Sequence, residues 1–292
     1  MPGPQVSVII PVKNEGINIL NTVKSIMGSH NTTPYELIVI DDGSRDNCCQ
    51  FLAGRTQPGS IRLLPTPGLG AAQARNAGAS IARGQILIFC DAHIFVEDYW
   101  IDRLLEPLLD GRLDAVCPGI APHDRPHDVA GGFTWDDQLK FTWLPRPPRL
   151  SLSPLLPGGC LAIKAGVFFD VGQFDRGLMV WGREDEEISL KMWLFGYRLG
   201  VNPEVKILHV FRERHPYTVT WENVDYNLLR MAYSHFRSER ISRVIDLIKN
   251  HPGSHRVERR VVESDVLIQR KEYFKKRKRD DDWFFERFRI PF

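Results

Sequence analysis

The chain has 292 residues, of which 43% are hydrophobic and 25% charged, and its formal net charge at pH 7 is +2. These values are ordinary for a globular protein, and so small a net charge does not by itself imply a polyanionic partner. Five cysteines without a Cys-x-x-Cys pair, a start unlike a signal peptide and the lack of a membrane-length apolar run predict a cytoplasmic protein with reduced thiols.

The first third of the chain alternates predicted strands with predicted helices. Short apolar runs rich in β-branched residues predict the strands, and apolar positions three and four residues apart predict the helices. Strands are expected over 6–12, 35–44, 60–66 and 85–93, and helices over 18–29, from near residue 46, and over 68–82. Helical crossovers between strands favour an α/β fold with a mostly parallel central sheet and helices on both faces.

The remainder of the chain is less regular. We expect a helix over 100–111, a strand over 113–120, a proline-rich surface loop over 144–159, a strand and helix over 159–172, a helix over 183–196, and a strand entering a polar loop over 205–218. Beyond about residue 222 the sequence becomes helical and charged. We therefore divide the chain into an α/β domain, residues 1–221, and a helical C-terminal extension, residues 222–292, rich in basic and aromatic side chains.

Polar side chains follow three of the predicted strands. They form the pairs Asn14–Glu15, Asp41–Asp42 and Asp91–His93. In parallel α/β sheets, ligands bind beyond the carboxyl ends of the strands. Three polar pairs at one edge of the sheet therefore predict a binding or catalytic site.

Asp91 and His93 lie two residues apart at the end of the fourth strand. Side chains at this spacing point to the same side of an extended chain, and a carboxylate with an imidazole suits Mn²⁺ or a similar divalent ion. An isolated Asp-x-His is more often a locally bonded turn, so its place at the sheet edge is what favours a metal. His209 is a candidate third ligand, although a lone histidine beside an apolar run is more often structural.

Several other positions allow both a structural and a functional interpretation. Asp41 and Asp42 suit a turn or helix cap as well as contacts to a base or ribose. Glu184, in a run of four acids, is placed to face a cleft, while Gly158 and Gly159 suit either close approach to a ligand or a plain turn. The sequence has no Walker loop, no Gly-x-Gly-x-x-Gly after the first strand and no Gly-x-Ser-x-Gly, so kinase, dehydrogenase and hydrolase functions lack support.

Eight segments, taken in chain order, carry a resemblance to a known family. Four of them resemble the nucleotide-sugar half of GT-A fold glycosyltransferases of the family 2 type: SVIIPVKNE, IVIDDGS, ARNAG and FCDAH. Four more resemble the catalytic domain of polypeptide N-acetylgalactosaminyltransferases: GGFTWDDQLKFTW, PGGCLAI, VWGREDEEISLKMWLFG and HVFRERHPYT. The resemblance covers residues 5–220. It implies a GT-A, Rossmann-like catalytic domain and a retaining, Mn²⁺-dependent transfer of a sugar, expected to be N-acetylgalactosamine, from a UDP-sugar to a hydroxyl of a peptide or protein.

The resemblance also implies roles for individual residues. Asp91, His93 and His209 match the metal ligands, with Asp-x-His replacing the Asp-x-Asp of most GT-A enzymes. Around the nucleotide sugar, the resemblance implies Pro11, Asn14 and Glu15 of the first motif and, for the uridine, Asp41 or Asp42. It implies four residues around the sugar: Arg75, Gly158, Gly159 and Glu184. Trp181 and Tyr217 match residues involved in the closure of a mobile loop. Arg212 and His215 of that loop would stabilise the UDP leaving group. Glu184 would orient the sugar rather than attack it, since the leaving phosphate is the expected base for the acceptor hydroxyl.

The acceptor is open at this point. Typical members of that family carry a membrane anchor, a stem, disulfides and a lectin domain, and none is visible here, so we expect a cytoplasmic catalytic core of microbial or viral origin. A second hypothesis is transfer to a hydroxymethylated base in DNA, because the run 270–279 has seven basic residues interleaved with aromatics. The run equally suits a solvated terminal helix or tail, and the acids at 280–282 weaken the polyanion interpretation. A third hypothesis, a metal-free binding module, would require degenerate site residues, and these positions are intact.

Overall fold

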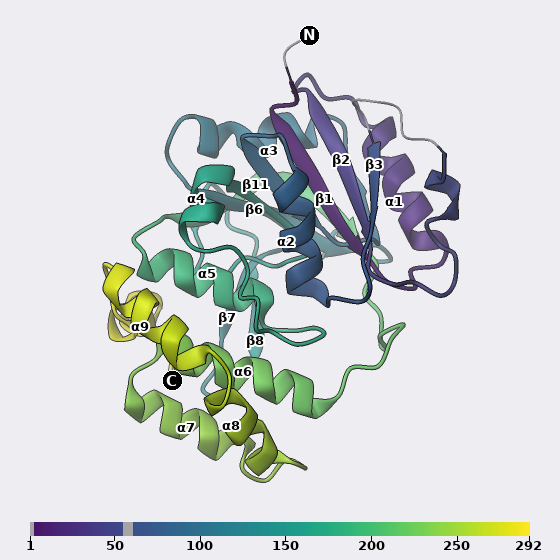
Figure 1. The fold of residues 1–292 in the computed structure, drawn as a ribbon. Helices are drawn as coiled ribbons and strands as arrows, with labels where there is room; N and C mark the ends of the chain where they lie inside the picture. The colour runs from purple at the N-terminus through teal and green to yellow at the C-terminus, as the bar shows by residue number, and fades with distance from the viewer. Residues whose placement is uncertain (1–2, 55–60) are drawn as a thin grey trace.

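The computed structural model describes residues 3–54 and 61–292 and is built around one mixed β-sheet (Figure 1). Along the sheet the strands run in the order β3 (Ile61–Pro65), β2 (Tyr35–Asp41), β1 (Val6–Val12), β4 (Ile86–Cys90), β10 (Cys160–Lys164), β6 (Ala115–Pro122), β11 (Leu199–His209) and β5 (Ile94–Val96). The first four are parallel and β11 is parallel to β6, whereas β10 and β5 are antiparallel to their neighbours. The α/β fold predicted from the sequence is confirmed. Ser60, the first residue of the predicted third strand, lies outside the described residues.

Alternate side chains of the central strands enter two hydrophobic cores, one on each face of the sheet. In β4, Leu87 and Phe89 face one core, while Ile86 and Ile88 face the other. Burial on both faces explains why these strands are continuous apolar runs in the sequence. The first core is covered by α2 (Ala71–Ile81), α4 (Ala165–Asp170) and α5 (Glu184–Leu194), and the second by α1 (Ile17–Gly28) and α3 (Trp100–Leu109).

The helix expected from near residue 46 is wrong for the described residues. Only a short 3-10 helix, η1 (Gln50–Leu52), forms there. The two carboxylate oxygens of Asp46 accept hydrogen bonds from the backbone amides of Gly16 and Cys48. Because these bonds fix a local turn and tie it to the start of α1, the carboxylate does not begin a longer helix.

The proline-rich stretch 144–159 is more ordered than the surface loop expected from its composition. A hairpin of β7 (Ala130–Trp135) and β8 (Phe141–Pro145) lies beside β6, and β9 (Ser151–Leu152) pairs with β11. Ser153 and Leu155 are buried, and the carbonyl of Leu155 accepts from the hydroxyl of Ser153 and the amide of Phe133. Paired backbone groups allow an irregular segment to be buried, which composition alone does not reveal.

The last part of the chain is a group of helices packed against α5 and β7, gathered in the lower part of Figure 1. They are α6 (Trp221–His235), α7 (Ser238–Ile248), α8 (Ser254–Val262), α9 (Val266–Lys276) and α10 (Asp281–Phe288). Their apolar side chains share the core of α2 and α5, and Trp135 stacks on Phe285 with ring centroids 6.1 Å apart. The helical character of the extension is confirmed, while its separation from residues 1–221 as a domain stays a prediction.

The basic run 270–279 is used inside the fold. Arg270 donates to the carbonyls of Tyr233 and Phe236, and Arg277 donates to that of His235, so both guanidinium groups lie at the C-terminal end of α6. Cations at a helix C-terminus satisfy its last carbonyls and complement its dipole. This arrangement argues against a free tail that binds phosphates.

The sequence predicted no membrane-spanning segment and reduced cysteines. Among the helices of the described ranges, none combines the length and the apolarity needed to cross a membrane. All five cysteines fall within those ranges, and each is a buried free thiol.

Candidate functional site

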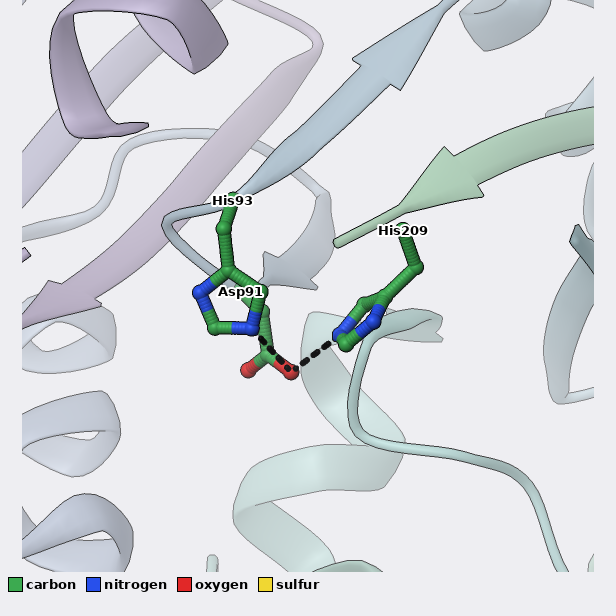
Figure 2. Close-up of side chains that lie close together, drawn as sticks. All are labelled: Asp91, His93 and His209. Carbon is green, nitrogen blue, oxygen red and sulfur yellow. Dashed lines mark hydrogen bonds and ion pairs between the residues drawn. The ribbon is translucent and has the colours of Figure 1, made fainter. Parts of the chain in front are cut away.

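Three predicted metal ligands converge beyond the carboxyl end of β4 (Figure 2). Asp91 follows β4, His93 precedes β5 and His209 ends β11. Both imidazoles are placed by strand register, because His209 pairs with Ile94 and the amide of Val210 donates to the carbonyl of His93. Nε2 of His209 lies 3.2 Å and Nε2 of His93 lies 4.0 Å from Oδ2 of Asp91. One ligand atom from each residue lies within 4.8 Å of the others, so this metal triad is a candidate metal site.

A buried arginine connects the metal triad to Glu184. Arg75 of α2 is 3% exposed, and it donates from Nη2 to Asp91 at 2.9 Å and from Nη1 to Glu184 at 3.1 Å. Burial would raise the pKa of Asp91, but the hydrogen bond from His209 and the charge of Arg75 outweigh it and hold this pKa well below its ordinary range. Asp91 is therefore an ionised carboxylate, and Arg75 joins the edge of the sheet to the start of α5.

The four acids at the start of α5 divide between the site and the core. Glu186 accepts a hydrogen bond from the indole of Trp135. Glu187 is fully buried and pairs with Lys191 and His235. These two acids hold the fold together, which leaves the first two acids of the run for the site.

Asp185, the second acid of the run, is a site residue that the sequence interpretation missed. Its Oδ2 accepts from the amide of Gly158 at 2.9 Å. Burial and the charges of the neighbouring glutamates raise the pKa of Asp185 to about 8. The glycines permit close approach here, because a Cβ would lie 3.3 Å from that of Asp185 at Gly158 and 3.3 Å from Cδ2 of His209 at Gly159. The only sequence signal for Asp185 was its place beside Glu184.

Glu15 and Arg212 meet at the imidazole of His93. Arg212 donates to Glu15 at 2.7 Å and lies 2.7 Å from Nδ1 of His93, while Glu15 lies 3.2 Å from the same nitrogen. Burial opposes the charge of Glu15, but the hydrogen bonds with His93 and Arg212 prevail and lower its pKa. Because Nδ1 faces Glu15 and Arg212, Nε2 is the nitrogen of His93 that faces Asp91 and is placed to bind a metal.

The segment 210–220, between β11 and α6, packs over this cluster. The ring of His215 lies 4.3 Å from that of Trp181, and Asn14 donates to a carbonyl of the segment at 3.3 Å. Burial and the charge of Arg212 lower the pKa of His215, while burial raises that of Tyr217. The predicted loop residues therefore lie over the metal triad in this structure.

Asp41 and Asp42 occupy different environments at the end of β2. Asp42 is buried and accepts from the hydroxyl of Thr66 and from the amides of Leu69 and Gly70, so it holds the turn before α2. Asp41 is partly exposed, and within the described residues its side chain accepts a hydrogen bond only from the backbone amide of Ser44. Of the two, Asp41 has the carboxylate with more capacity left to bind a ligand.

The predicted site residues fall into two groups. The first group surrounds the metal triad and Glu184 through direct contacts and comprises Glu15, Arg75, Asp91, His93, Gly158, Gly159, Glu184, His209 and Arg212. The second group lies on the ends of β1 and β2 and on the covering segments and comprises Pro11, Asn14, Asp41, Asp42, Trp181, His215 and Tyr217. The individual roles of these residues stay predictions.

Known proteins are similar to this chain in sequence. The family described as glycosyl transferase family 2 matches residues 7–149. Polypeptide N-acetylgalactosaminyltransferase 11 of Xenopus tropicalis is 31% identical over 259 residues, which cover 79% of this chain and 42% of that protein. Polypeptide N-acetylgalactosaminyltransferase 16 of Homo sapiens is 31% identical over 236 residues, covering 73% and 41%. The chain thus spans about two fifths of the length of these relatives. Both come from animals, so they lend no support to a microbial or viral origin, and neither supports a DNA acceptor.

Solved structures share the fold. The crystal structure of GalNAc-T7 with UDP, GalNAc and Mn²⁺ has a TM-score of 0.79 at 23% identity, covering 98% of this chain and 58% of that one. The mannosyltransferase PcManGT from Pyrobaculum calidifontis, in complex with GDP-Man and Mn²⁺, has a TM-score of 0.55 at 19% identity, covering 94% and 75%. Residues 7–149 are therefore a glycosyl transferase family 2 domain, in a chain of GT-A fold that is related to the polypeptide N-acetylgalactosaminyltransferases.

Proposed function

We propose that this chain is a retaining, metal-dependent glycosyltransferase that moves N-acetylgalactosamine from a UDP-sugar to a hydroxyl of a polypeptide. The observation that carries the proposal is the continuous cluster of the metal triad, Arg75 and Glu184 beyond the end of β4. Ligands of parallel α/β sheets bind at this edge. The names of the curated relatives and the UDP, GalNAc and Mn²⁺ of the GalNAc-T7 structure support the choice of sugar, nucleotide and metal.

The donor atoms of the metal triad fit Mn²⁺. One ionised carboxylate and two imidazoles form a mixed oxygen and nitrogen set, which suits this ion and leaves positions for water and phosphate oxygens. A bound divalent ion would neutralise the negative charge that develops on the departing UDP. His209 and Arg75 keep Asp91 ionised, and Glu15 and Arg212 both approach Nδ1 of His93, so Nε2 is the nitrogen that faces Asp91.

The other residues act on the leaving group and on the sugar. Arg212 and His215 lie on the segment that packs over the metal triad, where a cation and an imidazole of lowered pKa can donate hydrogen bonds to the leaving phosphates. The carboxylate of Glu184 is engaged by Arg75, which suits orientation of the donor sugar better than nucleophilic attack. The proton of the acceptor hydroxyl then passes to the leaving phosphate.

An aromatic surface beside the metal triad supports a polypeptide acceptor. The ring of Phe211 lies 4.3 Å from that of His209 and 6.1 Å from that of Trp143, which lies 6.2 Å from that of Phe141. Phe141 and Phe211 are 57% and 50% exposed. Exposed aromatic rings are common in surfaces that bind polypeptides. Arg270 of α9 and Arg277, which follows it, bind carbonyls at the end of α6, and this engagement of the basic run argues against a DNA acceptor.

The metal assignment is tested by Asp91→Asn. This variant should lose Mn²⁺ binding in calorimetry and Mn²⁺-dependent hydrolysis of UDP-N-acetylgalactosamine, because a neutral amide is a poor substitute for a carboxylate ligand. Asp110→Asn, a change at an exposed turn, is the matched control and should behave as the wild type. Hydrolysis retained by Asp91→Asn would overturn the assignment.

The acceptor is tested by mass spectrometry. Wild-type protein with Mn²⁺ is offered a panel of UDP-sugars together with peptide pools or hydroxymethylated DNA. A mass increase of one N-acetylhexosamine on peptides is the expected result. Transfer to the DNA alone would favour the nucleic-acid hypothesis.

A further inference from the structure

The turn 179–183, which precedes α5, is held by one side chain of the C-terminal helices. Asn227 of α6 is fully buried. Its Oδ1 accepts from the amide of Met179 at 2.7 Å, and its Nδ2 lies 2.8, 3.1 and 2.8 Å from the carbonyl oxygens of Met179, Trp181 and Gly182. A single side chain therefore satisfies backbone groups on three residues of this turn.

The backbone of the turn 179–183 is strained. Val180 and Arg183 have φ angles of 42° and 71°, in the left-handed region that residues with side chains rarely adopt. The carbonyl of Val180 accepts from the amide of Ala71 at 2.9 Å. Strained backbone persists only where its surroundings fix it. Here hydrogen bonds from α6 and from the start of α2 both fix it.

A second residue of α6 fixes the segment that leads into the turn. Arg230 donates from Nε and Nη2 to the two carboxylate oxygens of Asp175, each at 2.8 Å, and from Nη1 to Asp265 at 2.8 Å. A Cβ at Gly177 would fall 2.0 Å from the guanidinium carbon, so this segment lies directly against the arginine. Residues three apart share a helix face. One face of α6, carrying Asn227 and Arg230, therefore sets the path of the chain toward α5.

We propose that Asn227 is a positioning residue for the donor sugar. It sets the turn 179–183, and through this turn it sets Trp181 and the carboxylate of Glu184, although it lies outside the site. The inference rests on the proposed function, in which Glu184 orients the donor sugar. Asp41 and His209 end β2 and β11, and Asp91 and His93 lie between β4 and β5, so all four are outside the turn, and we expect binding of UDP without the sugar to depend on the turn much less than binding of the UDP-sugar. The C-terminal helices are then a structural part of the sugar site.

The test compares two ligands in three proteins. Calorimetry with Mn²⁺ measures the affinities of UDP and UDP-N-acetylgalactosamine for wild type, Asn227→Ala and Asn227→Ser. For Asn227→Ala we expect binding of the UDP-sugar to weaken about tenfold, equivalent to about 1.4 kcal/mol, and binding of UDP to change by less than about twofold. Asn227→Ser keeps one polar atom, so its loss should be smaller in the same direction, and it carries the comparison if Asn227→Ala does not fold.

A matched control separates positioning from general stability. Asn202 is also a buried asparagine with backbone partners, since it donates to the carbonyl of Arg103 and accepts from the amide of Glu204. Asn202→Ala should leave the ratio of the two affinities unchanged. Equal weakening of both ligands in the Asn227 variants, or no weakening of the UDP-sugar, would overturn the inference alone. Wild-type protein that binds neither nucleotide with Mn²⁺ would overturn the proposed function and the inference with it.

Discussion

Replacing Arg75 by methionine would leave two carboxylates without their shared counter-ion. The guanidinium nitrogens lie 2.9 Å from Asp91 and 3.1 Å from Glu184, and the arginine side chain is 4% exposed. Methionine fills much of the same space, so the variant removes charge and hydrogen bonds more than packing. Removing one partner of a buried ion pair costs about 3–5 kcal/mol. Because the side chain of Asp91 is 27% exposed and thus partly screened, we expect a loss near the lower end of this range at neutral pH.

The size of this loss should depend on pH. Arg75 helps to hold the pKa of Asp91 below its ordinary value of 3.8, so the stabilisation is present above that value and is lost as pH falls through the lower pKa of the folded state. The difference in unfolding free energy between wild type and Arg75→Met should therefore stay nearly constant from neutral pH to about pH 4 and shrink below about pH 4.

Urea unfolding followed by circular dichroism, at about pH 7.5 and about pH 3, measures both effects. Arg62→Met is the matched control, because Arg62 pairs with Glu36 at 3.4 Å but is 32% exposed. We expect this control to lose about 1 kcal/mol or less. A loss in Arg75→Met no larger than in Arg62→Met, or one that is equal at the two pH values, would refute the reasoning.

Three further predictions concern other parts of the molecule. In thermal unfolding, Asp185→Asn should be more stable than wild type near pH 8 and lose this advantage toward pH 4. With a pKa of about 8, Asp185 keeps a proton in the folded protein that it releases above about pH 4 in the unfolded chain, so ionisation favours unfolding of the wild type. A stability advantage that does not change with pH would contradict this. Gly159→Ala should weaken Mn²⁺ binding severalfold in calorimetry, since its Cβ would lie 3.3 Å from His209, whereas Gly166→Ala, whose Cβ meets nothing within 4 Å, should bind as wild type; equal affinities would count against His209 as a ligand. Truncation after residue 279 removes α10 with the fully buried Phe284, whose side chain alone is worth about 3–5 kcal/mol, so a truncated protein that unfolds at the same urea concentration as the full chain would show that α10 is not part of the core.

Local sequence patterns predicted well those features that depend on neighbours along the chain. The strands that became β1, β2 and β4 were predicted because burial on both faces makes each a continuous apolar run. Alternation along an extended chain placed Asp91 and His93 on one side. The error near Asp46 arose because its carboxylate bonds to Gly16, a contact between segments that a local pattern does not contain.

Partners distant in the chain explain what the sequence patterns left open. Side chains of the acidic run at the start of α5 look alike in sequence, yet Glu187 pairs with His235 in the core, while Asp185 accepts from the amide of Gly158 at the site. The structural role of the basic run 270–279 likewise became clear only from its contacts, because its arginines donate to the carbonyls at the end of α6.

The sequence by itself determined the α/β class, the edge of the sheet that holds the site and the Asp-x-His pair, because these follow from the periodicity of a strand and from the direction of parallel strands. Only the tertiary structure decided that His209, 118 residues from Asp91, completes the triad, that Arg75 joins it to Glu184, and that Asn227 holds the turn before α5. The physical reason is that burial, ion pairing and strain depend on which segments pack together. Long-range strand pairing and helix packing determine those contacts.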